Sequence, residues 1–328
     1  MSAFSDMVFS SSGRMGMPIA VHPGVALTRA RVRDIVTDPQ AQLEASAALH
    51  ERHKTPVVLS AMDLSAEAEA FGCDILFTDD EVPTVVGRHV TTAEAAKALR
   101  VPSPGEKRTR VYLETVRLLK KLAARPLVLA GCIGPFSLAG RLWGLTEALD
   151  LTISDPDLMH ILLEKSARFL VSYARAFKEA GADGMIMAEP AAGLLSPRSV
   201  ATFSSAYVRK VVEGAGDGRF SLILHNCAAK PVHLSAILEA GPKVFHFGAP
   251  MDIPAALGKT PADIILCGNL DPTSVFCQAS PQDFVVRMRA LLDATKDYRN
   301  YVISSGCDVP ARAPLANLDA FYETLRGA

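Results

Sequence analysis

Residues Ser221–Cys227 read SLILHNC, a short apolar run that ends in polar residues. A run of this length and content is typical of a β-strand that is buried on both faces, where the alternation of apolar and polar residues is lost. Seven further runs of this kind predict strands at Pro18–His22, Thr55–Ser60, Leu127–Gly134, Gly184–Pro190, Lys243–Gly248, Asp263–Asn269 and Tyr301–Cys307.

Amphipathic segments lie between these runs, and three of them carry helix start signals, at Ser154-Asp155-Pro156, Ser196-Pro197 and Ser280-Pro281. The first of these helices has an apolar face formed by Leu158, Leu162, Phe169, Tyr173 and Phe177. Strands that alternate with helices predict parallel β/α units, and about eight such units predict an α/β protein with a closed (β/α)8 TIM barrel. A doubly wound open sheet is the alternative.

The region 78–107 departs from this alternation. Asp79-Asp80-Glu81 followed by Pro83–Gly87 predicts a hairpin or excursion over Thr78–Val90 near the barrel mouth, and Val101–Lys107 has the Pro, Ser and Gly content of a linker. We find no linker that would divide the chain into independent domains. We therefore expect one barrel domain over residues 1–328, with this region as an insertion.

Composition excludes several functional classes. The 328 residues are 49% hydrophobic and 21% charged, the balance of a globular protein with a large core. The net charge of −1 argues against nucleic-acid binding, and no apolar run is long enough to span a bilayer. The first residues lack the apolar stretch of a secretory signal, and six widely spaced Cys do not resemble a disulfide framework. We expect a cytoplasmic enzyme with reduced thiols.

Candidate metal ligands follow the predicted strands. His225 and Cys227 are two residues apart on an extended strand, so their side chains point to the same side. Cys307 ends another predicted strand, and a barrel brings both strand ends to one mouth. Three nitrogen and sulfur ligands with an open fourth position are typical of catalytic zinc. The alternative is that these side chains simply pack together.

Other polar residues at strand ends are candidates for substrate contacts. They are His22, Asp63, Glu189, His246 and Asn269. Each also has a structural interpretation: Asp63 could cap the following helix, and His246 lies between Phe residues where a core histidine is common. Four further cysteines, by contrast, are expected to be buried small apolar residues, namely Cys73, Cys132, Cys267 and Cys277.

Several segments together resemble one known family. They are Met62–Ser65 with Glu67–Gly72, Gly134–Gly140, Glu189-Pro190 with Leu195-Ser196-Pro197, His225-Asn226-Cys227, Gly268–Pro272 and Ser305–Pro310. Over nearly its whole length the chain is similar to the uroporphyrinogen decarboxylase superfamily, and within it to the zinc-dependent methylcobamide:thiol methyltransferases of one-carbon metabolism. In that branch the His-x-Cys pair and the late Cys bind zinc, and all three positions match here.

The resemblance implies a zinc-dependent methyl transfer between a methylated corrinoid, carried by a partner protein, and a thiol such as coenzyme M. The acceptor sulfur would bind zinc as a thiolate and attack the methyl group. Relatives have an acidic residue near the sixth strand as a further zinc contact, whereas this chain has Val244–Pro250. Glu189, His246 or water could then supply the fourth ligand.

Two other functions remain open at this stage. The decarboxylase branch of the superfamily acts on a carboxylated tetrapyrrole without a metal. Its N-terminal Arg-Gln-Ala-Gly-Arg signature is replaced here by Ser11–Gly16, which argues against decarboxylation. A barrel that binds a corrinoid or a partner without catalysis is the non-enzymatic alternative.

Overall fold

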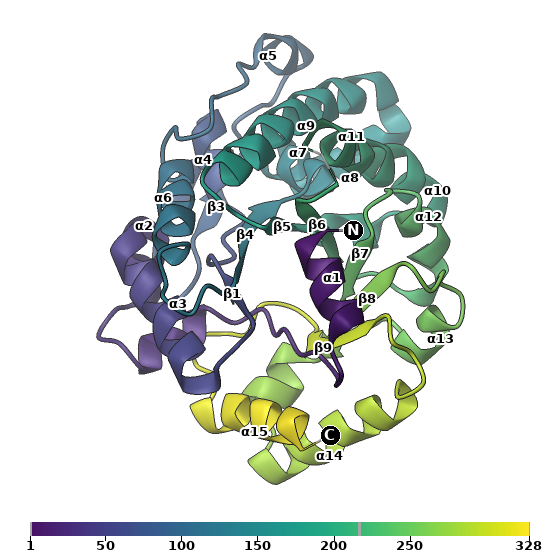
Figure 1. Ribbon diagram of the computed structural model, residues 1–328. Coiled ribbons are helices and arrows are strands. Elements are labelled where there is room, and N and C mark those ends of the chain that lie inside the picture. Colours follow the sequence, from purple (N-terminus) through teal and green to yellow (C-terminus); the bar gives the residue numbers. More distant parts are fainter. Residues whose placement is uncertain (1, 216–217, 328) are drawn as a thin grey trace.

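The computed structural model describes residues 2–215 and 218–327 and is built on a curled parallel sheet (Figure 1). Seven strands form the sheet in the order β1-β4-β5-β6-β7-β8-β9. Their bounds are β1 Val57–Leu59, β4 Leu127–Ile133, β5 Gly184–Ala188, β6 Ser221–Asn226, β7 Val244–Phe247, β8 Ile265–Leu270 and β9 Tyr301–Ser305. Each lies within one of the predicted apolar runs or extends one residue beyond it, so these seven strand predictions are confirmed.

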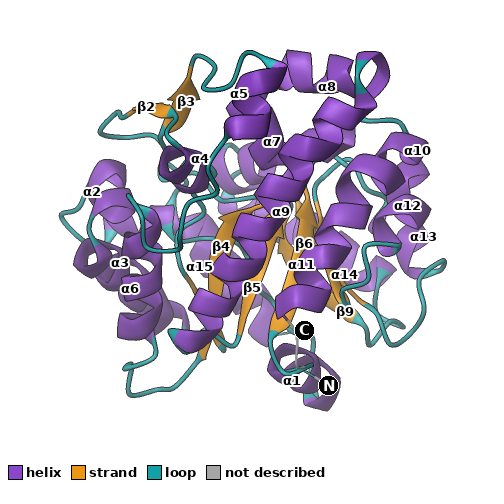
Figure 2. Ribbon diagram, turned by 90° about the horizontal axis from the view of Figure 1, so that it is seen from above, coloured by secondary structure: helices purple, strands orange, loops and turns teal. Residues whose placement is uncertain are grey.

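Helices surround the sheet on its outer face (Figures 1 and 2). The α-helices are α1 Ala3–Ser10, α2 Val32–Thr37, α3 Pro39–His53, α4 Ala66–Phe71, α5 Ala93–Ala98, α6 Thr109–Leu119, α7 Pro135–Trp143, α8 Leu145–Ser154, α9 Pro156–Glu179, α10 Pro197–Ser199, α11 Ala206–Ala215, α12 Leu234–Leu238, α13 Ile253–Leu257, α14 Pro281–Ala294 and α15 Leu315–Arg326. Shorter turns of 3₁₀ or π type are η1 His22–Ala26, η2 Pro190–Leu194, η3 Val200–Ser205, η4 Pro231–His233 and η5 Pro272–Cys277.

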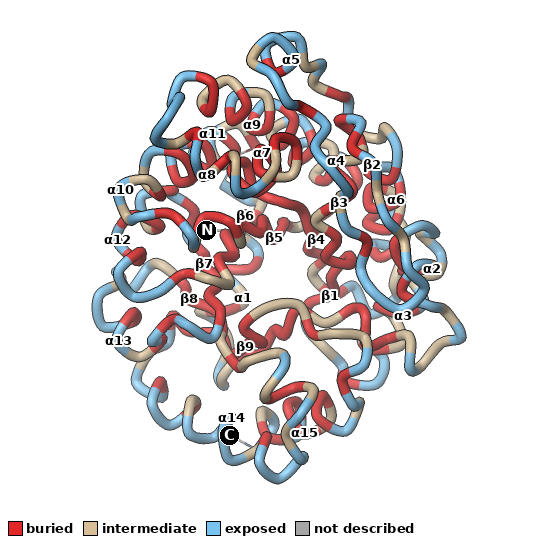
Figure 3. The backbone as a smooth tube through the Cα atoms, turned by 180° about the vertical axis from the view of Figure 1, so that it is seen from behind, coloured by how far each residue is buried: buried red, intermediate tan, exposed pale blue. Residues whose placement is uncertain are grey.

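The three helix start signals are confirmed by capping hydrogen bonds. The Asp155, Ser196 and Ser280 side chains accept from the backbone N–H of Leu158, Ser199 and Asp283, respectively. The five apolar residues predicted for one face of α9 are all buried against the sheet and its neighbouring helices. Burial is concentrated on the strands and the inner helix faces (Figure 3).

The first predicted strand, Pro18–His22, is not a strand. Gly16 makes a single parallel bridge to Ile303 of β9, and Met17 donates its N–H to the Ile303 carbonyl at 2.9 Å. Regular pairing stops there because Pro18 has no N–H, and a 3₁₀ turn begins at His22. The architecture is therefore a curled seven-stranded sheet with an extended segment along one edge. We call residues 15–19 the edge segment.

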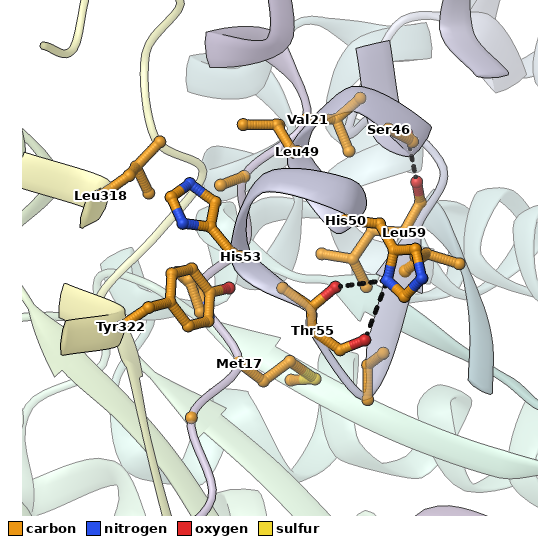
Figure 4. A pocket seen from close by; sticks show the side chains of 15 residues that line it. Met17, Val21, Ser46, Leu49, His50, His53, Thr55, Leu59, Leu318 and Tyr322 are labelled. Carbon is orange, nitrogen blue, oxygen red and sulfur yellow. Dashed lines mark hydrogen bonds between the residues drawn. The ribbon is translucent and has the colours of Figure 1, made fainter. Parts of the chain in front are cut away.

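The sheet does not pair regularly between β1 and the edge segment, and side chains fill this seam (Figure 4). Met17 of the edge segment lines it together with His50 and His53 of α3 and with Tyr322 of α15. His53 stacks on Tyr322 with ring centroids 4.6 Å apart. The cavity left between them is about 30 Å³, so the seam is closed by packing rather than by backbone pairing.

The two ends of the sheet differ. At the amino ends of the strands α1 packs beneath the sheet (Figure 2), where Phe4 donates its N–H to Ser221 at the start of β6. Beyond the carboxyl ends, β2 Asp74–Leu76 and β3 Thr84–Val86 form an antiparallel hairpin. This hairpin begins four residues before the predicted excursion at Thr78. No helix in the described residues is long and apolar enough to cross a membrane.

Candidate metal centre

Three potential metal ligands meet at the carboxyl end of the sheet. His225 lies near the end of β6, Cys227 follows that strand, and Cys307 follows β9. One ligand atom from each residue lies within 4.8 Å of the other two. Among the described residues this is the one such group of His, Cys, Asp or Glu side chains. The sheet's curl makes the meeting possible, because β7 and β8 separate β6 from β9.

Two glycines allow the backbone to come this close. A Cβ atom on Gly248 would lie 2.0 Å from the carbonyl oxygen of Cys227. A Cβ atom on Gly306 would lie 2.9 Å from the backbone nitrogen of Ala249. Both distances are shorter than real Cβ contacts, so a side chain at either position would push the turn after β7 away from the turn after β6 or from the turn after β9.

The two sulfurs influence each other's protonation. A hydrogen bond from Cys307 lowers the pKa of Cys227, although burial opposes this shift. The same hydrogen bond raises the pKa of Cys307 well above its usual value, and burial raises it further. Without a cation the pair therefore retains a proton at neutral pH. A metal ion removes that restriction because it stabilises both thiolates.

His225 has one ring nitrogen free for a ligand. Its Nδ1 lies 2.8 Å from Nδ1 of His246, while its Nε2 is buried and, among the described residues, has no nitrogen or oxygen hydrogen-bond partner. A buried imidazole nitrogen without a partner, close to two thiols, is a donor set that fits zinc. This unpaired nitrogen is the observation that favours a metal site over simple packing.

His246 lies behind His225 rather than beside the cysteines. It is fully buried on β7, in register with His225, and its Nε2 lies 2.8 Å from Oγ of Ser304 on β9. Burial and the neighbouring His225 lower the pKa of His246 well below its ordinary value. Because both ring nitrogens contact other side chains of the protein, His246 has no free nitrogen for a metal or a substrate.

Glu189 also uses both of its carboxylate oxygens internally. Oε1 accepts from the Phe136 N–H at 2.8 Å, and Oε2 accepts from the N–H and hydroxyl of Ser137 at 3.0 and 2.9 Å. Burial raises the pKa of Glu189 to about 7, and these hydrogen bonds oppose the rise. Glu189 therefore binds the amino end of α7. A Cβ atom on Gly134 would lie 2.2 Å from its Cγ.

Asp63 and Asn269 are held in similar ways. Asp63 is buried, accepts from the Ser65 N–H at 2.9 Å and from the Tyr112 hydroxyl at 2.8 Å, and forms an ion pair with Arg108. Asn269 donates from Nδ2 to the carbonyls of Gly248 and Met251 at 3.0 and 2.6 Å. The structure does not bring these side chains into the ligand group.

His22 lies in a different environment, where it contacts the residue that follows one of the candidate metal ligands. Its Nδ1 is 2.8 Å from Oδ2 of Asp308, the residue after Cys307. Burial lowers the pKa of His22, but the charge of Asp308 and the hydrogen bond to it outweigh burial and leave the pKa raised. His22 Nε2 and Asp308 Oδ1 are buried without partners in the part of the chain that the structure describes, and both residues line a cavity of about 350 Å³ with Arg312.

Sequence reasoning missed the partners of these residues. Ser304 and Arg108 carry no motif, whereas Asp308 lies in the Ser305–Pro310 segment that carries the family resemblance, although its contact with His22 was not predicted. Of the four cysteines expected to be buried, Cys73, Cys132 and Cys267 are buried as predicted. Cys277 is partly exposed, because it ends the short η5 turn instead of lying inside the sheet.

The chain is similar to known proteins over most of its length. The family described as uroporphyrinogen decarboxylase (URO-D) matches residues 21–328. The methylcobamide:CoM methyltransferase MtbA of Methanosarcina mazei is 29% identical over 294 residues, which cover 87% of this chain and 85% of the relative. A uroporphyrinogen decarboxylase of Pseudoalteromonas atlantica is 24% identical, covering 92% and 88%. The solved structure of a methyltransferase from Methanosarcina mazei aligns with a TM-score of 0.89 at 20% identity, covering 99% and 97%.

Proposed function

Because the chain belongs to the uroporphyrinogen decarboxylase family, we propose that it is a zinc-dependent methyltransferase that moves a methyl group between a methylated corrinoid and a thiol. The observation that carries this proposal is the meeting of His225, Cys227 and Cys307 at the carboxyl end of the sheet. Similarity to a methylcobamide:CoM methyltransferase over most of both chains supports it.

The protein's own residues would hold the metal through Nε2 of His225 and the two cysteine sulfurs. Zinc, when bound there, would favour the thiolate form of an acceptor thiol at neutral pH. The two cysteine thiolates balance its charge, and His225 adds a neutral donor. Glu189 and His246 are engaged elsewhere, so the fourth position is proposed to receive the acceptor or water.

The transfer itself needs no oxidant or reductant from outside. The carbon–cobalt bond of the methylated corrinoid breaks with its electron pair left on cobalt, and a sulfur–carbon bond forms. The proton of the acceptor thiol passes to solvent. Of the predicted substrate contacts, His22 remains the strongest candidate, because it lines a cavity together with Asp308, the residue after Cys307, and its Nε2 has no partner among the described residues. The roles proposed for Asp63, Glu189, His246 and Asn269 are positional.

The same proposal extends to the barrel architecture, the domain organisation, the partner protein, the acceptor thiol and the location in the cell. The edge segment would act as an eighth strand that completes a (β/α)8 barrel, and residues 1–328 would form one domain with an insertion at 78–107. A corrinoid protein would dock at the carboxyl ends of the strands. Coenzyme M is the thiol suggested by the relative's name, and a cytoplasmic location remains a prediction.

A decarboxylase of a carboxylated tetrapyrrole is the second candidate, because relatives with that name cover 92% of the chain at 24–25% identity. The ligand group distinguishes the two functions, since decarboxylation in this family does not require zinc. A corrinoid-binding protein without catalysis would bind the corrinoid partner but would not demethylate methylcobalamin.

The test measures zinc stoichiometry and methyl transfer from methylcobalamin to coenzyme M, homocysteine and other thiols, with tetrahydrofolate as a non-thiol control. Wild type should hold one zinc per chain and methylate a thiol. His225→Ala, Cys227→Ala and Cys307→Ala should lose zinc and activity while circular dichroism stays unchanged. Cys267→Ala, a buried cysteine outside the group, is the matched control. Full zinc content and turnover in Cys307→Ala would overturn the proposal.

A further inference from the structure

A row of three contacts runs behind His225, away from the cysteines. Nδ1 of His225 lies 2.8 Å from Nδ1 of His246, and Nε2 of His246 lies 2.8 Å from Oγ of Ser304. Ser304 in turn donates its hydroxyl proton to the carbonyl of Met17 at 2.5 Å. The row joins β6, β7, β9 and the edge segment, and all three side chains are at most 2% exposed.

The direction of each hydrogen bond follows from the end of the row. A carbonyl oxygen cannot donate, so the proton between Ser304 and Met17 belongs to the Ser304 hydroxyl. Ser304 has no second proton, and its oxygen must accept from the Nε2–H of His246. A neutral His246 protonated at Nε2 has a lone pair on Nδ1. It therefore accepts from the Nδ1–H of His225, whose Nε2 then carries a lone pair.

The same order of protons follows when the row is followed from the metal-binding end, at His225. A histidine that binds a metal through Nε2 must keep its proton on Nδ1, and only an acceptor placed opposite Nδ1 stabilises that tautomer. In this protein the acceptor is His246, and Ser304 fixes which nitrogen of His246 is free to accept. The two rings meet nearly edge to face, at an interplanar angle of 79°, which also fixes the orientation of the His225 ring.

We propose that His246 and Ser304 are positioning residues, which with the Met17 carbonyl hold His225 in the tautomer that leaves Nε2 free to bind the metal. This inference rests on the proposed zinc site, but the proton order it assigns is a property of the metal-free protein. It also gives the edge segment a role in the site, because the Met17 carbonyl sets the direction of the whole row.

The first experiment reads the protons directly. Nitrogen NMR of the metal-free protein, labelled at histidine, distinguishes the two tautomers through the shifts and long-range couplings of the ring nitrogens. At pH 7.5 we expect His225 protonated at Nδ1 and His246 at Nε2. His225 protonated at Nε2 in the wild type would overturn the inference. A wild type that binds no zinc would refute the proposed function, yet this spectrum would still test the proton order.

The second experiment compares two serines on β9. Ser304→Ala removes the link in the row, whereas Ser305→Ala removes an equally buried hydroxyl, one that accepts from the Ile19 N–H at 2.9 Å. Zinc affinity is measured by competition with a chelator. We expect Ser304→Ala to bind zinc about 10- to 100-fold more weakly, and its His225 tautomers to become mixed. Ser305→Ala should keep wild-type affinity. Equal affinities for the two variants would contradict the inference.

Substitution of His246 provides a further variant should Ser304→Ala fail to fold. Gln offers an amide donor toward Ser304 and a carbonyl acceptor toward His225, as the proposed tautomer of His246 does. Leu fills similar space and offers neither. His246→Gln should therefore bind zinc more tightly than His246→Leu. Equal zinc affinities in these two variants would show that His246 acts only by packing.

Discussion

The carboxylate of Glu189, which lies at a strand end, forms its hydrogen bonds with other residues of the protein rather than with a substrate. All its partners are donors, at the backbone of Phe136 and at the backbone and hydroxyl of Ser137. A Gln at this position must turn its amide group toward at least one of these donors. We predict that Glu189→Gln lowers the free energy of unfolding by about 1–3 kcal/mol, because a buried donor loses its acceptor.

Urea denaturation measures this loss, and the exposed Glu179 provides the matched control as Glu179→Gln. Zinc affinity should be unchanged in Glu189→Gln, since its contacts are to α7 and not to the ligand group. A variant with wild-type stability and reduced thiol methylation would instead identify Glu189 as a substrate contact.

At the scale of elements, α3 joins the sheet to α15 through His53. Burial lowers the pKa of His53 to about 4, and the nearby charges of Arg52 and Arg326 lower it while Asp319 raises it. Its ring is packed against Tyr322 (Figure 4), and its Nε2 has no hydrogen-bond partner among residues 2–215 and 218–327. Between pH 6.5 and about 4 the unfolded chain binds a proton that the folded protein excludes.

Because the unfolded chain binds more protons than the folded protein, the free energy of unfolding should fall as the pH falls through this range. His53 contributes at most about 1.4 kcal/mol per pH unit to this fall. His53→Phe keeps an aromatic ring against Tyr322 and removes the titration. Urea unfolding at pH 7.5 and pH 5 should therefore show a smaller loss in His53→Phe than in wild type. The exposed His89, replaced by Gln, should leave the loss as in wild type.

At the scale of the whole molecule, the edge segment holds the curled sheet together. Met15, Met17 and Ile19 are buried, and the segment hydrogen-bonds to Ile303 and to Val309. In contrast, α1 covers only the amino ends of the strands (Figure 1). Burial of each large apolar side chain in the segment contributes about 1.5–3 kcal/mol.

Two truncations separate these contributions. Removal of residues 2–13 should lower stability but preserve cooperative unfolding in urea. Removal of residues 2–20 should expose the edge of β9 and abolish the cooperative transition, with increased binding of a hydrophobic dye. It also removes the Met17 carbonyl and should weaken zinc binding. A cooperative transition with the same midpoint in both truncations would contradict this role for the edge segment.

Seven strands and the candidate ligands His225 and Cys227 could be predicted from the sequence because local patterns encode them. A strand buried on both faces must be an apolar run, and His225 and Cys227 must share a side if they lie on an extended strand. Cys307 could be added only by assuming a curled sheet and by the family resemblance. The seven-stranded sheet agrees with these expectations and the three side chains lie together, while their binding of zinc stays a prediction.

Tertiary structure alone decided what the remaining polar residues do. His246 and Glu189 end strands much as His225 does, yet their hydrogen-bond partners come from Ser304 and Ser137, which are 58 and 52 residues away in sequence. No local pattern encodes a partner at that distance. The first predicted strand is a similar case: the run Pro18–His22 predicted a strand, but Pro18 limits pairing along the edge segment to one bridge, at Gly16. An apolar run is a local feature of the sequence and indicates which segments are buried, whereas the pairing of polar groups depends on the whole fold.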